Sequence, residues 1–551
     1  MRTRFTPLLA VALIASVGVS AQDAPRIVNI PQSQDPNTIR NFIEADLATS
    51  DTATVASTLY TLDRDGLYLY NGQWQPEYSV NIAAAEGEGA RPIIVSENVE
   101  GEASRWMRSV AAYTLTGLYI SSVDVGGEQT DNAPLRPRGN GTTVRFENNV
   151  LNDQRFEVLR TDASNLTVYM IDNIVPRNYQ RDLWYKNGGL WFQRGNPLDS
   201  MIFRGNTYYD TPARFTHSIN GAPIEYLEFT NNTIHNVGGM AELNQYGGLP
   251  LAVLDLGISI NCVVQNNIMH NVGFMGVDSG DVNNIGIFNW YPLDQVALDT
   301  FGFPGGQTLT ITNNNLFTDP DLLANTPDTA RNIPLFTAQL DSFYALRGDG
   351  SMTNMEMFMQ ENIAEPLTFT NVPDNKQLFI DAKIARWANP ATASNDVLIL
   401  NSFIPDGSVY EDITQLDFSY IEDAESYSAA TDGGPLGARR WFPNFDPADT
   451  SDSRAIDFAS PELAGLELAP NPAIASATLT FDLPSTAEVV VNVYDVAGEM
   501  LTRQEVGVFG QGRGHSVAVD VATLPRGVYA VTLIADTEER RIGAVRRLIK
   551  Q

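Results

Sequence analysis

The feature that most constrains the fold is a short phrase that returns six times between Thr142 and Pro320. Each copy has an apolar step, a residue pair that ends in asparagine, and another apolar step, as in VRFENNVLND and LEFTNNTIHNVGG. The closest copies place their asparagines at 149 and 173, 24 residues apart, and the most distant at 267 and 314, 47 residues apart. A repeat with a minimum in the twenties and a variable excess predicts a solenoid of short stacked strands, with the excess leaving as loops.

The second member of each pair is predicted to stand at a tight corner between two strands. Asparagine is the non-glycine residue that most readily adopts φ > 0, and its amide can bond the neighbouring backbone. In stacked coils these amides would lie in register, each bonding the asparagine of the next coil. We expect one column, formed by Asn149, Asn173, Asn206, Asn232, Asn267 and Asn314.

With these corners, the stretch from Ile93 to Pro320 resembles the right-handed parallel β-helix superfamily, the pectate-lyase-like group. The resemblance extends to opening coils such as VNIAAAEG and PIIVS, and to a closing DGGPLGARRW. It implies an all-β chain built as a right-handed parallel β-helix solenoid. It implies little about chemistry, because the group contains lyases, hydrolases, esterases and proteins without catalysis.

The C-terminal part has a different pattern, with alternating apolar residues in TLTFDL, EVVVNVYDVAGE, SVAVDV and GVYAVTLIA. This alternation predicts a small antiparallel β-sandwich. The segment resembles the type IX secretion sorting domain through PNP at 470–472, VYDVAG at 493–498, LPRGVY at 524–529 and a basic end at 546–550. The resemblance implies that an outer-membrane translocon reads this domain, and that the protein is released or attached at the cell surface.

The chain is therefore expected to have four parts. Residues 1–21 read as a signal peptide, with Arg2 and Arg4 before an apolar centre and a small-residue exit. Residues 22–444 form the β-helix domain with an N-terminal cap and loop insertions, 445–464 a linker, and 465–551 the sorting domain. Because no later stretch approaches 18 apolar residues, no transmembrane segment is expected.

Charge and cysteine content limit the possible partners and the sources of stability. The chain carries 66 acidic and 35 basic residues, a formal charge of −31, which repels polyanions and argues against nucleic acid as a partner. Its single cysteine, Cys262, allows no internal disulfide, so stability must come from the stacked core. We expect this thiol to be buried and inert.

Two aromatic-rich excursions interrupt the repeat and are the candidate glycan contacts. The first holds Trp184, Tyr185 and Trp191, and the second holds Trp290 and Tyr291. Exposed aromatic pairs on loops can stack on the apolar faces of sugar rings. In the alternative interpretation, these side chains plug the loops onto the wall of the solenoid.

A lyase that acts on acidic sugars needs a base and a cation to hold the developing charge. Lys186 is the only lysine in the repeat region and is the candidate base. Asp278 and Asp281 are the candidate ligands of Ca²⁺, the one cofactor considered. A solvated turn is the alternative for this acidic pair. The hydrolase and esterase signatures of the fold are not found in this region.

His235 and His270 occupy the same place in two copies of the repeat. A catalytic histidine would rarely be duplicated at equivalent positions, whereas a structural corner residue would, so a structural role is expected. A stacked pair that binds a metal or a sugar is the alternative.

The function predicted from the sequence is that of an exported, surface-directed monomer that binds polysaccharide without catalysis. One alternative is a Ca²⁺-dependent polysaccharide lyase acting on uronic-acid glycans. Another is a structural or adhesive cell-surface protein.

Overall fold

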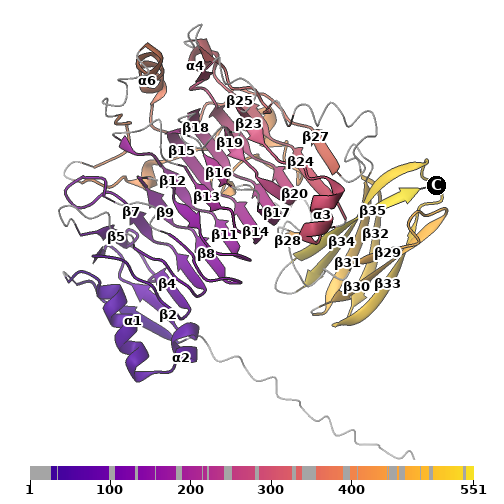
Figure 1. Ribbon diagram of the computed structural model, residues 1–551, viewed down its shortest axis with the longest axis horizontal. Coiled ribbons are helices and arrows are strands. Elements are labelled where there is room, and N and C mark those ends of the chain that lie inside the picture. The colour runs from indigo at the N-terminus through magenta and orange to yellow at the C-terminus, as the bar shows by residue number, and fades with distance from the viewer. Residues whose placement is uncertain are drawn as a thin grey trace, which may run out of the picture.

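The computed structural model describes a long solenoid followed by a small sandwich (Figure 1). The predicted signal peptide lies outside the described residues. These are 26–33, 35–97, 106–130, 135–155, 157–181, 189–213, 215–219, 222–240, 251–278, 285–303, 305–324, 330–337, 340, 355–388, 398–405, 408–443, 445, 456–457, 466–483, 485–494, 500–537 and 541–550.

The longest sheet, sheet A, has eleven described strands, all paired in parallel and stacked in chain order. Each strand belongs to one coil, so the pairing is that of a parallel β-helix and confirms the predicted fold class. The strands are β1 (Ile27–Ile30), β2 (Leu59–Leu62), β4 (Val80–Ala84), β6 (Tyr113–Thr116), β8 (Thr143–Glu147), β11 (Thr167–Ile171), β14 (Leu198–Arg204), β17 (Pro223–Thr230), β20 (Ile258–Gln265), β24 (Gln307–Thr312) and β27 (Met355–Gln360).

Sheet B has nine described strands, each of which follows a strand of sheet A in the same coil. They are β3 (Leu67–Tyr70), β5 (Ile93–Ser96), β7 (Tyr119–Ser121), β9 (Val150–Asn152), β12 (Ile174–Pro176), β15 (Thr207–Ala213), β18 (Thr233–Met240), β21 (Ile268–Val272) and β25 (Asn315–Phe317).

The third side of the solenoid, side C, is less regular. It comprises β10 (Leu159–Thr161), β13 (Trp191–Arg194), β16 (Thr216–Ile219), β19 (Leu251–Asp255) and β23 (Ile285–Asn289). A short antiparallel pair, β22 (Val277–Asp278) with β26 (Ala330–Arg331), lies outside these three sides.

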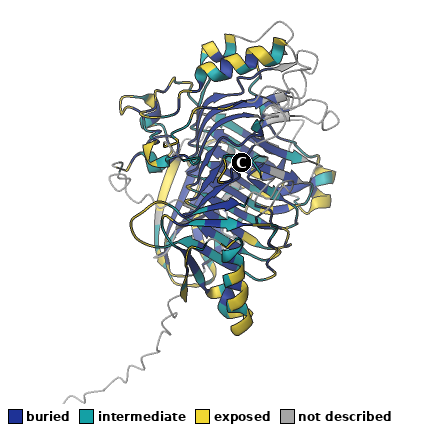
Figure 2. Ribbon diagram, turned by 90° about the vertical axis from the view of Figure 1, so that its left-hand side faces the viewer, coloured by how far each residue is buried: buried dark blue, intermediate teal, exposed yellow. Residues whose placement is uncertain are grey.

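Alternation within each strand of sheet A produces the core. Successive side chains of a strand point to opposite faces, and parallel pairing in register stacks like positions over one another. Phe146, Met170, Phe203 and Phe229 are paired in this way and form a buried column inside the solenoid. Figure 2 shows these stacked strands as the buried part of the molecule.

The six asparagines predicted to form a column do so. The Oδ1 atom of Asn206 accepts hydrogen bonds from the backbone N–H and the Nδ2 atom of Asn173, at 2.9 and 3.0 Å. The same pair of hydrogen bonds links each asparagine of the column to the next, from Asn149 to Asn314. Because every amide is buried and bonded, the column joins the coils without leaving polar groups unsatisfied.

Two details of the corner differ from the sequence interpretation. The backbone turns at the residue before the column, with φ of 53° at Asn148 and 54° at Asn231, so the asparagine of the column is not the residue with positive φ. The column also extends one coil further, to Asn362, whose Oδ1 accepts from Asn314 at 3.0 and 2.9 Å. The repeat thus continues past Pro320 in the copy MFMQENIAE, where Glu361 replaces the first asparagine and has φ of 53°.

The N-terminal residues pack against the first end of the solenoid. Helix α1 (Thr38–Thr49) buries Ile39 and Ile43 against the core of the solenoid. Helix α2 (Thr52–Ser57) begins at Asp51, whose side chain accepts from the backbone N–H of Thr54.

After the last coil, described residues of the stretch 363–443 lie along the outer face of sheet B, and we call these described residues the return segment. It contains α6 (Lys376–Ala388) and three short 3₁₀ helices, η5 (Ile413–Gln415), η6 (Glu425–Tyr427) and η7 (Arg439–Trp441). Phe418 and Leu436 of this segment pack on outward residues of sheet B such as Tyr209 and Ile268. Two other helices, α3 (Gln295–Phe301) and α4 (Pro320–Ala324), lie in connections between strands.

The C-terminal unit is a sandwich with its own core, separate from that of the solenoid. Apart from one two-residue parallel pair, its strands pair antiparallel. That pair joins β35 to residues 456–457, which the sequence assigned to the linker. The strands are β28 (Ile456–Asp457), β29 (Glu467–Ala469), β30 (Ser476–Leu483), β31 (Ala487–Tyr494), β32 (Met500–Phe509), β33 (Gly512–Asp520), β34 (Gly527–Thr537) and β35 (Arg541–Lys550).

Candidate functional site

Only some residues of the predicted loop site belong to the part of the chain that the structure describes. Trp184, Tyr185 and Lys186 lie outside the described residues, as does Asp281. The backbone of Asp278 pairs with Ala330, but its side chain is outside the described part. The catalytic and Ca²⁺-binding roles of these residues remain predictions.

Two of the predicted glycan contacts are core residues. Trp191 opens β13 at an inward position, is 1% exposed and packs on Phe203. Trp290 is fully buried, and its Nε1 atom donates to the carbonyl oxygen of Ser259 at 2.9 Å. The prediction that these two indoles contact a glycan is wrong, because both side chains are buried in the core of the solenoid. Tyr291 is half-buried, and burial raises the pKa of its phenol.

The two histidines lie side by side on strands β18 and β21, each directly before a residue with positive φ, Asn236 at 55° and Asn271 at 59°. Their Nδ1 atoms are 3.2 Å apart, and the aromatic rings of Phe369 and Phe418 pack against them. Burial holds the pKa of His235 well below its usual value and lowers that of His270 to about 4. Both rings are therefore neutral at pH 7 and support the covering of sheet B by the return segment.

Other reactive groups are also sequestered. The Cys262 side chain points inward, and burial raises the pKa of its thiol to about 12, so it is inert at neutral pH as predicted. Asp210 is fully buried and accepts from Asn236 at 2.9 Å and Asn375 at 2.6 Å. Burial raises the pKa of this carboxyl to about 7. These groups have structural partners and no access to a polymer.

The outer face of sheet A carries partly exposed side chains along several coils and is the candidate binding surface. Alternation places one row of outward residues on β8 to β24 in register: Arg145, Tyr169, Ile202, Glu228, Val263 and Thr310. A second row, two residues further along each strand, comprises Glu147, Ile171, Arg204, Thr230, Gln265 and Thr312. Most of these side chains are half-buried, whereas Ile202 and Glu228 are buried.

One end of this face combines an aromatic ring with ion pairs. The guanidinium carbon of Arg145 lies 4.1 Å from the centre of the Tyr169 ring, and its Nε atom donates to Glu147 at 2.8 Å. Two coils on, Arg204 holds Glu228 with bonds of 2.7 and 2.9 Å. These contacts fix the orientation of the side chains on an otherwise open surface.

Further along the face the outward groups are neutral. Gln265 donates to the Thr312 hydroxyl at 2.9 Å, and the Thr308 hydroxyl donates to the Asn261 amide oxygen at 3.0 Å. Sequence reasoning did not select these residues, although their outward positions follow from alternation in copies such as VRFE, VYMI and LTIT. The face offers ring surfaces, hydroxyls and amides, which suit contact with a hydroxyl-rich chain.

Within the described residues, no group of three or more histidine, cysteine, aspartate or glutamate side chains is arranged to hold a metal ion. None of the helices in this part of the chain is long and apolar enough to span a bilayer.

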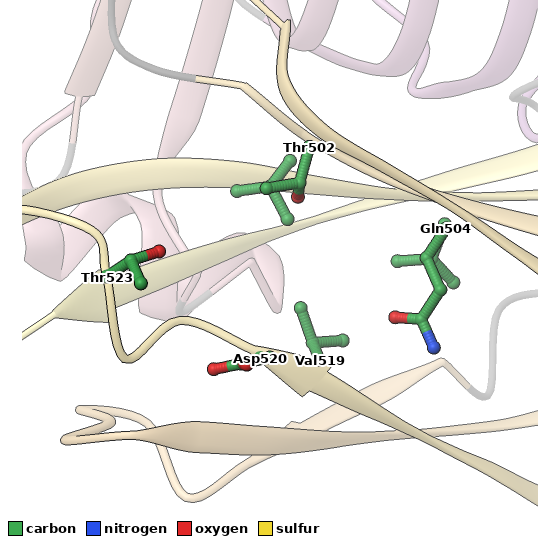
Figure 3. A pocket seen from close by; sticks show the side chains of 7 residues that line it. Thr502, Gln504, Val519, Asp520 and Thr523 are labelled. Carbon is green, nitrogen blue, oxygen red and sulfur yellow. The ribbon is translucent and has the colours of Figure 1, made fainter.

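The sandwich has a separate small hollow of about 160 Å³ (Figure 3). It lies where β32 and β33 face each other, and it is lined by Thr502, Gln504, Val519, Asp520 and Thr523 together with two valines of β31. The Asp520 carboxylate accepts from the backbone N–H of Ala522, so it closes a local turn.

Comparison with known proteins identifies the sandwich. Residues 467–550 match the family described as secretion system C-terminal sorting domain. This domain indicates export by the type IX secretion system, to the cell surface or into the medium. A search of curated proteins finds no match.

Solved structures share little sequence with the chain. A crystal structure of pectate lyase Pel9A is 13% identical, with 75% of this chain and 96% of that chain covered and a TM-score of 0.32. An engineered protein and an endo-beta-1,4-mannanase double mutant from Cellulomonas fimi are each 15% identical, with 49% of this chain and 55% of theirs covered and TM-scores of 0.14 and 0.13. The assignment of the solenoid rests on the strand pairing described above.

Proposed function

We propose that this exported β-helix protein binds a polysaccharide on the outer face of sheet A and does not cleave it. The observation that carries the proposal is the pair of registered outward rows on β8 to β24, on the side of the solenoid that the return segment does not cover. Export to the cell surface or the medium brings this face into contact with extracellular polymers.

The chemistry of the rows supports a carbohydrate rather than an apolar ligand. The half-buried ring of Tyr169 in the first row, and that of Tyr226, which lies two residues before Glu228 on β17 and donates its hydroxyl to that carboxylate at 3.1 Å, offer flat surfaces on which the apolar side of a sugar can stack. Hydroxyl and amide groups surround them, and these exchange hydrogen bonds with sugar hydroxyls at little net gain each. Because neighbouring strands lie about 4.8 Å apart, the face repeats similar groups at short intervals, so a polymer can make many weak contacts at once.

A panel of neutral and acidic polysaccharides tests the proposal. The full-length secreted protein is applied to each glycan in an affinity gel, and the same mixtures are followed in the ultraviolet for unsaturated products, with Ca²⁺ and with chelator. We expect retention on at least one glycan and no product in either condition.

Three outcomes separate the possible functions. Unsaturated products that disappear with chelator would establish the Ca²⁺-dependent lyase and overturn the proposal. Absence of both retention and products across the panel would favour the structural or adhesive protein. Retention that survives Tyr169→Ala and Tyr226→Ala together would locate binding elsewhere and refute the assignment to sheet A.

A further inference from the structure

The corner between sheets A and B carries two arginines that share one acceptor. The Oδ1 atom of Asn148 accepts from Nη2 of Arg91 at 2.8 Å and from Nη2 of Arg440 at 2.7 Å. Arg91 also donates to the backbone carbonyl of Asn148, and Arg440 to that of Asp172 at 2.7 Å. Arg91 comes from the turn before β5 and Arg440 from η7, so the fold brings the two guanidinium groups together from distant parts of the chain.

In the part of the chain that the structure describes, the two positive charges form no ion pair with a carboxylate. Within the described part of the chain, the hydrogen bonds of these guanidinium groups go to amide and carbonyl oxygens, and neither group forms a salt bridge. Burial, together with the charges of Arg440 and Arg64, lowers the pKa of Arg91 to about 10. Burial also lowers the pKa of Arg440, against the opposing charge of Asp172. An anion placed here would relieve like-charge repulsion.

The guanidinium groups retain donors for a ligand. Arginine has five N–H donors in a planar fork, and the bonds to the corner engage only part of each set. Both side chains are half-buried, and none of their nitrogens is among the buried atoms without a partner. A carboxylate or sulfate oxygen pair matches the remaining fork geometry.

We propose that Arg91 and Arg440 form an oxyanion site that receives the carboxylate or sulfate group of an acidic polysaccharide. This inference rests on the proposed function and names the class of glycan. The corner continues the binding face, because β8 carries Arg145 and leads through Glu147 into Asn148. Burial raises the pKa of the Asp172 carboxyl, and the charges of Arg440, Arg204 and Glu147 also act on it. Arg440 at the corner and the two residues of the second outward row therefore lie close enough to influence the same charged group.

The net charge of −31 repels a polyanion at long range, but this repulsion does not prevent local binding of an anion at the corner. At physiological ionic strength the Debye length is about 8 Å, so remote surface carboxylates are largely screened from the corner. The half-buried arginines are screened much less, and their contact with an anion determines the local preference.

The test compares an oligogalacturonate with a neutral oligogalactan of equal length, by calorimetric titration of the full-length protein. Wild type is expected to bind the acidic oligomer at least tenfold more tightly. The double variant Arg91→Gln/Arg440→Gln should lose this preference and keep its affinity for the neutral oligomer. Arg40→Gln, which removes one charge from an exposed pair with Glu44 at the N-terminal cap, is the control and should bind as wild type does.

A second arm uses sodium sulfate as a simple anion and measures the shift of the melting temperature relative to sodium chloride at equal ionic strength. Wild type should gain stability from sulfate, and the double glutamine variant should gain less. Arg91→Lys/Arg440→Lys keeps both positive charges but removes the planar guanidinium donors, and should give an intermediate shift. This variant distinguishes the loss of the anion site from misfolding of the corner.

The outcomes for the site and for the function differ. A sulfate response that needs both arginines, without binding of any glycan, would support the anion site and refute the proposed function. Equal affinity for both oligomers with no specific sulfate response would refute the anion site and leave glycan binding standing.

Discussion

Arg177 and Glu411, 234 residues apart in the chain, form a buried ion pair with 2.6 Å between Nη1 and Oε2. The hydroxyl of Tyr209 donates to the same carboxylate oxygen at 2.8 Å, and Asp153 binds the other side of the guanidinium at 3.0 Å. Because Arg177 follows β12 and Glu411 belongs to the return segment, this pair fastens the segment to the outer face of sheet B.

Glu411→Gln should destabilise the solenoid strongly. The substitution leaves the guanidinium of Arg177 buried with one carboxylate instead of two, and breaking a buried pair costs about 3 kcal/mol or more. Denaturant unfolding, followed by tryptophan fluorescence, measures the change. Glu44→Gln, which breaks an exposed pair with Arg40, should cost less than about 1 kcal/mol, and equal losses for both variants would contradict the role of the pair.

Asn206→Ala should weaken the column at its centre. It removes the acceptor of two bonds from Asn173 and the donor to the carbonyl of Met170, and each buried group left without a partner costs about 1 to 3 kcal/mol. We expect a loss of about 3 kcal/mol in the free energy of unfolding. Asn261→Ala, an exposed asparagine of the same sheet, is the comparison and should change stability by less than about 0.5 kcal/mol.

The histidine pair should make the solenoid sensitive to acid. The pKa of His270 falls from 6.5 to about 4 on folding, mainly by burial, so the unfolded chain binds more protons between these values. The free energy of unfolding is therefore highest, with respect to this group, above pH 6.5. It declines as the pH falls toward 4, by about 3 kcal/mol in total. Asp319, which is paired with Lys376, is the charged group that acts on this ring.

The measurement is the difference in unfolding free energy between wild type and His235→Gln/His270→Gln, at pH values from 8 to 4. This difference should shrink on acidification. A difference that stays constant with pH would mean that the pair does not titrate with folding.

Asp210 should have the opposite pH dependence. Burial raises the pKa of its carboxyl from 3.8 to about 7, despite the bonds from Asn236 and Asn375, so the ionised form is disfavoured in the folded state. The resulting penalty is absent below pH 3.8 and grows to about 4 kcal/mol as the pH rises through 7. Arg177 reduces it and Glu411 increases it. The stability of Asp210→Asn relative to wild type should therefore increase as the pH rises from 4 to 8. Calorimetric melting of both proteins over this range measures the difference. A difference that stays constant or falls would contradict the prediction.

Tyr169→Ala should weaken glycan binding by about tenfold, equivalent to about 1.4 kcal/mol. The ring is held by Arg145 on the open face, and its removal deletes the stacking surface. Tyr291→Ala is the matched comparison, because it removes the same side chain from the loop selected by sequence. Affinity electrophoresis in a gel that contains the retaining glycan compares the affinities of the two variants. A larger loss of affinity for Tyr291→Ala would favour glycan binding by the loop.

The sequence by itself determined the coil and its register. The column from Asn149 to Asn314 and the inward alternation beside it are local patterns, and parallel stacking in register reproduces them in every coil. The sorting domain was also readable, because its strands and turns are close in sequence. The seventh copy of the repeat was missed, since Glu361 stands there in place of the asparagine, aspartate or glycine of the other copies.

Only the tertiary structure decided which surfaces are open. Trp191 and Trp290 occupy the core, because the packing of the coils, and not residue type, decides which aromatic side chains are exposed. The covering of sheet B depends on contacts such as that of Arg177 with Glu411. The shared hydrogen bonds of Arg91 and Arg440 to Asn148 bring together segments that are far apart in the sequence. Such contacts form only after the coils have stacked, so no local pattern encodes them.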